Sequence, residues 1–330
     1  MKPAILTLIF LLTSCATKSA NPKVRLGNSG TGLQTWSMPM TLASTLGFFE
    51  AEGVDAVIEN LPNTVKVMQA LLGGSIDVVG LPFVQNIQMA ADGQSVRSFF
   101  LMTRQASMVL LVAPSANQRI QRIQDLKGAV IGVPALGSQS HLWTNSILAA
   151  HGIGPSEFTA VGIGAAASSI AAIESGRVDA AQVAGGDHIR LLRRHPNLRI
   201  LLDGSKGQSA SSTAEIFASG ALSAKQEWLD RNPDTARRLA RAMLRTHQWI
   251  ATHSVEQIHE KLPPGFHSED AALDREIIQW GLDTYTIEGR MPLGAPACMK
   301  RFLDSAIEKV RTTKIDLNAT WTNDFLPAAK

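Results

Sequence analysis

The sequence predicts an α/β protein made of two similar lobes, each a mainly parallel sheet flanked by helices. Between residue 24 and about residue 203, short β-rich runs alternate with helical stretches, which is typical of parallel strands joined by helices. The pattern also repeats. Ala51-Glu52-Gly53-Val54 returns 99 residues later as Ala150-His151-Gly152-Ile153, and Gly74-Ser75-Ile76-Asp77-Val78 returns 102 residues later as Gly176-Arg177-Val178-Asp179-Ala180. Two copies of one α/β unit are the economical explanation.

Each copy contains three predicted strands and two predicted helices. In the first copy the strands are 24–27, 54–58 and 76–79, and the helices are 40–52 and 64–72. In the second copy the strands are 129–133, 158–161 and 178–181, and the helices are 140–150 and 168–174. A glycine follows each of these helices closely, and glycine is the residue that most often ends a helix.

Two pairs of closely spaced strands predict where the chain crosses between the lobes. They are 98–102 with 108–112, and 199–202 with 214–218. The crossings then lie near 103–107 and 204–213, and the second is rich in residues that permit hinge movement. The predicted lobes are therefore 24–104 with 213–330, and 105–212.

Beyond Gly220 the pattern changes to helices. Asn232 is a plausible N-cap, with Pro233 at the first helical position. Apolar residues then recur at helical spacing up to Ile250, and four arginines lie off that stripe, at positions 237, 238, 241 and 245. We interpret these arginines as a solvated face.

The N-terminus has the layout of a secretory signal peptide. One lysine precedes an apolar run, 4–12, that is far too short to span a bilayer as a helix. Leu12-Thr13-Ser14-Cys15 resembles the bacterial lipobox. That resemblance implies a signal peptide 1–14, lipid on Cys15, a tether 15–23, and an extracytoplasmic protein anchored to a membrane. The alternative is an ordinary signal peptide with a chance cysteine, and Ala16 leaves open which membrane holds the anchor.

Composition limits the function classes. Residues 15–330 are too many for one ordinary core and suit two domains. The formal net charge of +3 is too weak to indicate a nucleic acid partner. The chain has two cysteines. Once Cys15 carries lipid, Cys298 alone can form neither an intramolecular disulfide nor a cysteine-based metal site.

Four segments carry motifs in a fixed order. They read G-F-F-E-A-E-G-V-D (47–55), D-L-K-G-A-V-I-G-V (125–133, followed by Gly137-Ser138), A-I-E-S-G-R-V-D-A (172–180) and E-W-L-D-R-N-P (227–233). Together they resemble the ABC-transporter solute-binding proteins of the nitrate, taurine and aliphatic-sulfonate type. The resemblance implies the two-lobed type II periplasmic binding protein fold, with extra C-terminal helices and a cleft that closes over a small solute. It also implies a permease with its ATPase as partner, and we expect a monomer.

Candidate binding residues lie where strands lead into helices. Ligands of open α/β sheets bind beyond the carboxyl ends of strands, and helix N-termini hold anions without a cationic side chain. The strongest candidates are Ser138, Gln139 and Ser140, because they offer hydroxyl and amide donors at a helix start. They suit sulfonate, carboxylate or nitrate oxygens. The alternative is that Ser138 only caps the helix.

Further candidates come from other loops. Ser29 and Gly30 follow the first strand, and Thr64 starts the helix after the second. Trp36 and Phe83 have two open interpretations, as apolar walls for the organic part of a solute or as core residues. Asp187 is either a partner for an ammonium group such as that of taurine or, more simply, a helix N-cap.

The sequence lacks the motifs that are typical of related enzymes and metal carriers. Pyrimidine-forming enzymes of thiamine synthesis resemble this family but use a cysteine-rich motif that this sequence lacks. The histidines form no H-E-x-x-H pair, and no serine lies in a G-x-S-x-G elbow. Iron-binding relatives use paired tyrosines, and Tyr285 is single. We therefore expect no enzyme, no cofactor and no metal. Two alternatives stay open. The solute could be a thiamine-pyrimidine precursor or another neutral heterocycle, and the lipoprotein could sense its solute instead of serving transport.

Overall fold

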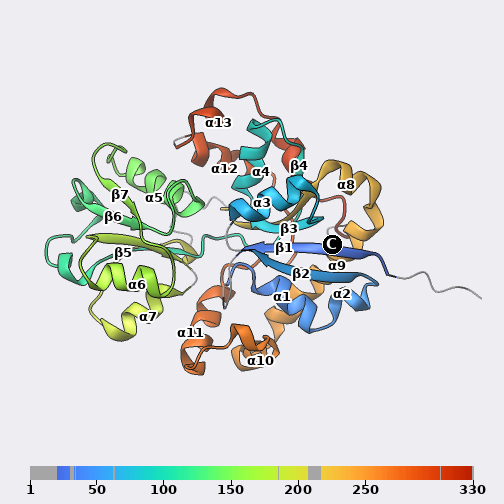
Figure 1. Cartoon of the computed structure of the whole chain (residues 1–330), viewed down its shortest axis with the longest axis horizontal. Helices are drawn as coiled ribbons and strands as arrows, with labels where there is room; N and C mark the ends of the chain where they lie inside the picture. The colour runs from blue at the N-terminus through green and yellow to red at the C-terminus, as the bar shows by residue number, and fades with distance from the viewer. Residues whose placement is uncertain are drawn as a thin grey trace, which may run out of the picture.

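The fold contains two five-stranded sheets, each flanked by helices (Figure 1). The structure, a computed structural model, describes residues 21–29, 33, 35–61, 64–184, 186–206, 217–304 and 306–328. The predicted signal peptide and Cys15 lie outside the described residues. Within the described residues, no helix combines the length and apolarity that a membrane crossing requires. The α/β prediction with two sheets is confirmed.

The first sheet has the strand order β2-β1-β3-β10-β4. Its strands are β1 (Lys23–Ser29), β2 (Asp55–Leu61), β3 (Val78–Pro82), β4 (Val96–Leu101) and β10 (Gly220–Lys225). The helices that accompany it are α1 (Met38–Thr45), α2 (Phe48–Ala51), α3 (Thr64–Gly73), α4 (Val84–Ala91), α8 (Gln226–Arg231) and α9 (Pro233–Thr252). Strand β1 runs parallel to β2 and β3, and β10 runs antiparallel to β3 and β4.

The second sheet has the order β7-β6-β8-β5-β9, which matches the first position by position. Its strands are β5 (Met108–Val112), β6 (Val130–Val133), β7 (Thr159–Gly162), β8 (Ala180–Ala184) and β9 (Ile200–Asp203). Its helices are α5 (Gln139–Ala150), α6 (Ala167–Glu174) and α7 (Asp187–Arg194), with the 3₁₀ turns Pro114–Ala116, Ile123–Leu126 and Gly204–Lys206. The shared order is the one expected from the internal repeat.

The aspartate of the repeated motif explains why the repeat is visible in the sequence. Asp77 Oδ2 accepts a hydrogen bond from the backbone N–H of Arg25 at 2.9 Å, and Asp179 Oδ2 accepts one from that of Val130 at 2.8 Å. Each aspartate also donates its own backbone N–H to the carbonyl of the same partner. The side chain thus fastens the loop before the third strand to the first strand, in both sheets, by satisfying a backbone donor that would otherwise stay unpaired.

Two sequence predictions differ from the structure. The helix predicted over 40–52 is split into α1 and α2, because Gly47 adopts a left-handed φ of 69° between them. The strand predicted over 214–218 is not found at Phe217 or Ala218, and residues 207–216 lie outside the described residues. The strand is β10, in a region predicted to be helical. Its sequence, G-A-L-S-A-K, has no β-branched residue, so hydrogen bonding to β3 and β4 on both sides makes it a strand.

Helix α9 confirms the predicted start at Pro233, but its arginines are more than a solvated face. Arg241 and Arg245 both bind the Glu52 carboxylate, at 2.8 and 3.1 Å, and Arg238 donates to the carbonyl of Gly53 at 3.2 Å. Burial alone would raise the pKa of Glu52, but the hydrogen bonds from the two arginines outweigh it and hold that pKa below its usual range. These contacts attach α9 to the turn after α2.

The C-terminal segment contacts both lobes. It contains α10 (Val255–Lys261), α11 (Ala271–Leu282), α12 (Ala295–Asp304) and α13 (Glu308–Thr312), with the 3₁₀ turns Pro264–Phe266 and Leu317–Thr320. Helix α12 packs on α4 and on α5, and α11 packs on α7 (Figure 1). In Figure 1 these two contacts lie at opposite sides of the molecule. The exact lobe boundaries, 24–104 with 213–330 and 105–212, stay a prediction.

Candidate functional site

A cavity of about 750 Å³ is lined by residues of both lobes. On the first lobe, Ser29 ends β1, Thr64 begins α3 after β2, and Gln85 lies in the first turn of α4 after β3. On the second lobe, the segment 134–140 follows β6 and Asp187 follows β8. The wall is therefore built at the carboxyl ends of the parallel strands, where open α/β sheets bind ligands.

The N-termini of five helices meet this cavity, whereas none of its described lining residues is cationic. Lining residues lie at or just before the first turns of α3, α4, α5, α6 and α7. Helix N-termini carry unpaired N–H groups and partial positive charge. Among the described residues that line the cavity there is no lysine, arginine or histidine, and Asp187 is the single charged side chain. The positive potential at the wall therefore comes from the backbone.

The start of α5 shows that capping and cavity lining occur together. Ser138 Oγ accepts a hydrogen bond from the backbone N–H of His141 at 3.4 Å and donates one to the carbonyl of Ala135 at 2.7 Å. The Nδ1 atom of His141 accepts from the backbone N–H of Gly137 at 2.9 Å. Burial lowers the pKa of His141. Ser138 lines the cavity as well, so the two interpretations of this serine do not exclude each other.

Two buried amide atoms on the cavity wall make no hydrogen bond within the described part of the chain. They are Nε2 of Gln139 and Oε1 of Gln182. The other side-chain amide atom of Gln182, Nε2, donates to the carbonyl of Val183 at 2.8 Å, which fixes the orientation of the side chain. Buried polar atoms are nearly always paired in native proteins. One buried donor and one buried acceptor of lining residues thus have no partner among the described residues.

Asp187 caps a neighbouring helix. Its Oδ2 atom accepts hydrogen bonds from the backbone N–H of Ala166 at 2.9 Å and from Ser169 Oγ at 3.2 Å, at the start of α6. The N-cap of its own helix, α7, is Gly186 with a φ of 94°. The predicted capping role of Asp187 is therefore found at the neighbouring helix α6 and not at its own. Burial raises the pKa of this carboxyl, and the hydrogen bonds and Arg190 oppose that rise. Asp187 also lines the cavity.

The structure brings most of the predicted residues together. Seven of the nine line the cavity: Ser29, Trp36, Thr64, Ser138, Gln139, Ser140 and Asp187. Gly30 lies outside the described residues. Phe83 does not line the cavity, because its side chain is fully buried in the core at the N-terminus of α4. That these residues bind a solute stays a prediction.

Several further residues line the cavity that the sequence did not predict. One face of α3 continues the wall from Thr64 to Val65, Met68, Gln69 and Leu72. Once Thr64 is placed at the cavity, the helical spacing i, i+4, i+8 identifies this face. Gln182 also had a signal, because a glutamine in the apolar strand β8 must find a polar partner in the interior. Ser107 and Ser219 lie beside the antiparallel strands β5 and β10, and no local pattern marks them.

Comparison with known proteins places the chain in a family. Residues 34–257 match the model of the NMT1/THI5-like family. YtlA of Bacillus subtilis, which carries the name of a binding protein, is 24% identical over 284 residues, covering 84% of this chain and 80% of YtlA. A 4-amino-5-hydroxymethyl-2-methylpyrimidine phosphate synthase of Schizosaccharomyces pombe is 25% identical over 142 residues, 42% of this chain and 40% of the enzyme.

Solved structures share the fold. A protein of Bordetella bronchiseptica superposes with a TM-score of 0.81 at 29% identity, covering 92% of this chain and 95% of that one. The alkanesulfonate-binding protein SsuA of Xanthomonas axonopodis, bound to MOPS, superposes with a TM-score of 0.70 at 16% identity, covering 91% and 98%. At that identity the likeness to SsuA shows the fold, which is that of a periplasmic binding protein. The chain is a member of the NMT1/THI5-like family.

Proposed function

We propose that this protein is an extracytoplasmic solute-binding protein that captures a small organic anion between its lobes and delivers it to an ABC permease with its ATPase. One observation carries the proposal: five helix N-termini from both lobes meet one cavity, and none of the described residues that line it has a cationic side chain. Such a wall holds sulfonate or carboxylate oxygens through backbone N–H groups, with donors from Gln139 and Ser140 beside them.

The size and the apolar part of the cavity favour an organic solute over a bare nitrate ion. A volume of about 750 Å³ lies within the range of pockets for drug-sized molecules, roughly 300–1,000 Å³. Trp36, Met68, Leu72 and Met108 supply apolar surface on the same wall. An anionic head at the helix starts and an apolar body against these side chains would use both parts. Alkanesulfonates and taurine have this form.

A neutral pyrimidine precursor of thiamine is the second candidate. The observation that favours it is the pair of amide atoms of Gln139 and Gln182, which form a donor and an acceptor without any charge. The partial similarity to a pyrimidine phosphate synthase agrees with this candidate. We propose binding rather than catalysis, because the single titratable side chain on the described wall, Asp187, uses a carboxylate oxygen to cap α6.

Calorimetry with the purified protein tests both candidates. Ethanesulfonate, taurine, nitrate, short carboxylates and 4-amino-5-hydroxymethyl-2-methylpyrimidine are titrated in turn. We expect sulfonates to bind, and Gln139→Ala to weaken them about tenfold through one lost hydrogen bond. The matched control is Gln94→Ala, an exposed glutamine away from the cavity. If only the pyrimidine bound, the pyrimidine would replace the sulfonates as the first candidate. If Gln139→Ala and Gln94→Ala bound the solute with equal affinity, the binding site would not lie in this cavity.

We further propose that lipid on Cys15 holds the protein on the outer side of a membrane. The lipobox-like run 12–15 supports this. Cys15→Ser should move the protein from the membrane fraction to the soluble fraction, and an unchanged distribution would contradict the anchor. Genes for a permease and an ATPase beside this one would favour uptake, whereas a neighbouring sensor kinase would favour signalling.

A further inference from the structure

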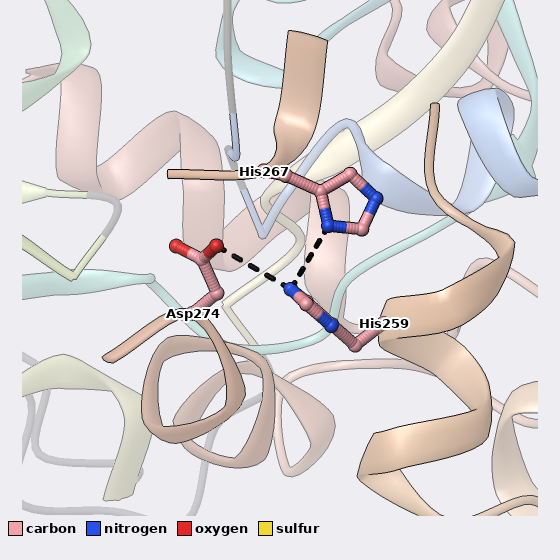
Figure 2. A group of neighbouring side chains, drawn as sticks. All are labelled: His259, His267 and Asp274. Atoms are coloured by element: carbon pink, nitrogen blue, oxygen red, sulfur yellow. Dashed lines mark hydrogen bonds and ion pairs between the residues drawn. The ribbon is translucent and has the colours of Figure 1, made fainter. Parts of the chain in front are cut away.

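Two histidines and a buried aspartate converge at one point outside the solute cavity. His259 lies in α10, His267 in the connection that follows it, and Asp274 in the first turn of α11. Figure 2 shows the two rings and the carboxylate directed toward one another. Each residue offers one ligand atom, and these atoms all lie within 4.8 Å of one another. His259 and Asp274 are buried, and His267 is exposed.

Two of the three spacings between these atoms are close to those of ligands around one ion. His259 Nε2 lies 3.1 Å from His267 Nδ1 and 3.4 Å from an oxygen of Asp274. In a tetrahedral zinc site the metal–nitrogen and metal–oxygen bonds are about 2.0–2.2 Å long, which places neighbouring ligand atoms about 3.3–3.5 Å apart. The third pair, His267 Nδ1 and the Asp274 oxygen, lies within 4.8 Å. An ion that binds all three atoms therefore requires this pair to approach by up to about 1.4 Å, which the exposed His267 side chain permits.

Outer contacts hold the ligand atoms in this orientation. His267 Nε2 lies 2.9 Å from the carbonyl of Leu262, so Nε2 carries the proton and the lone pair of Nδ1 faces the cluster. Ser268 donates its backbone N–H and its hydroxyl to the two oxygens of Asp274, both at 2.7 Å. Hydrogen bonds of this kind, from a histidine to a carbonyl and to a ligating carboxylate, are typical of the outer shell of metal sites.

The buried charge of Asp274 gives a reason for a cation at this point. Its side chain is almost fully buried, and it pairs with a histidine rather than with a lysine or arginine. A buried carboxylate is costly unless a positive charge compensates it. A divalent ion supplies that charge.

We propose that His259, His267 and Asp274 bind one zinc ion. Two imidazole nitrogens and one carboxylate suit zinc, whereas calcium and magnesium prefer oxygen ligands alone. The exposed His267 provides the path of entry and leaves the fourth position to water. The ion joins the end of α10 to the start of α11. The site is separate from the solute cavity, so it does not depend on the proposed function.

Titration of the purified, metal-free protein with zinc tests the proposal. We expect one zinc per chain and a zinc-dependent rise in the melting temperature. His267→Ala, an exposed position, should weaken zinc binding at least about 100-fold, and the outer-shell variant Ser268→Ala about 10- to 100-fold. The matched control is His195→Ala, which removes a partly exposed histidine 3.1 Å from Glu174 on the other lobe and should leave zinc affinity unchanged.

Spectroscopy separates a metal site from a merely structural cluster. Cobalt replacing zinc should give a visible ligand-field absorption in the wild type and in His195→Ala, and none in His267→Ala or Asp274→Asn. Magnesium should not compete with zinc. Absence of stoichiometric zinc binding, or binding that His267→Ala leaves intact, would overturn the proposal and show that the three side chains form a hydrogen-bonded cluster only. Melting curves in chelator show whether each variant is folded.

Discussion

At the scale of single residues, Asp187 has two roles that usually occur apart. Its carboxylate caps α6 through Ala166 and Ser169, and it also forms part of the cavity wall. The caps and the positive helix ends keep a negative charge tolerable in a site that we propose for anions. The other carboxylate oxygen, Oδ1, lies 3.9 Å from Nε of Arg190.

Asp187→Asn should therefore change the affinities for two classes of sulfonate in opposite directions. Asparagine keeps the acceptor for Ala166 but removes the negative charge. We expect the affinity for ethanesulfonate to rise, because a repulsion is lost. The affinity for taurine should fall about tenfold or more, because its ammonium group loses a charged hydrogen bond worth about 1.5–3 kcal/mol. Calorimetry with both solutes measures the two changes. If both affinities changed in the same direction, the ammonium group of taurine would not bind at Asp187.

At the scale of elements, some helices and strands follow from the local sequence pattern, and others depend on their tertiary contacts. The first strand, the helix at α3 and the start of α9 agree closely with the predictions, because apolar spacing, glycine and proline mark them locally. Strand β10 does not carry such marks and exists because two neighbours pair with it. In the cavity, residues after the parallel strands were predictable from the strand–helix order, whereas Ser107 and Ser219 beside the antiparallel strands were not.

Helices α7 and α11 are joined by charges that cross from one lobe to the C-terminal segment. Arg193 of α7 pairs with Asp270 and with Glu276, the latter at 2.8 Å, and these hydrogen bonds raise the pKa of the guanidinium. Close by, Gly186 lets α11 approach, because a Cβ there would lie 2.6 Å from Ile277. This contact lies next to Asp187, so the packing of α11 bears directly on the cavity wall.

Arg193→Ala should loosen the arrangement of the lobes with little effect on stability. The pairs are partly exposed, so we expect less than about 1 kcal/mol of destabilisation. If the present arrangement is the one that binds solute, losing the pairs lowers its population and weakens solute binding about 2- to 5-fold. Calorimetry at low and high salt checks this, since screening should remove the difference. An exposed control is Arg177→Ala. Equal affinity in both variants would show that the pairs do not bias the lobes.

At the scale of the whole molecule, two buried histidines make stability depend on pH. Burial lowers the pKa of His188, which packs against Trp280, and that of His247, which packs against Phe100, to about 4. In the unfolded chain both groups titrate near 6.5. Between these values the unfolded state binds more protons than the folded state, so stability is complete above pH 6.5 and is lost as the pH falls toward 4.

We expect this loss to reach about 3 kcal/mol for each histidine over that interval. Urea unfolding at several pH values measures it. His247→Gln should reduce the slope of unfolding free energy against pH between 6.5 and 4, although the variant is less stable at neutral pH because it disturbs a buried position. A partly exposed control, His195→Gln, should keep the wild-type slope. A slope unchanged in His247→Gln would contradict the assignment.

The sequence by itself determined the strand–helix order, the internal repeat, the α5 cap at Ser138 and the loops that end at the cavity. These depend on periodicity, on glycine and proline, and on short-range hydrogen bonds, which neighbouring residues decide. Only the tertiary structure decided that Phe83 belongs to the core, that Gln182 lines the cavity, and that His259, His267 and Asp274 converge. Those outcomes depend on which distant segments pack together, and side-chain burial and direction follow from that packing rather than from local spacing.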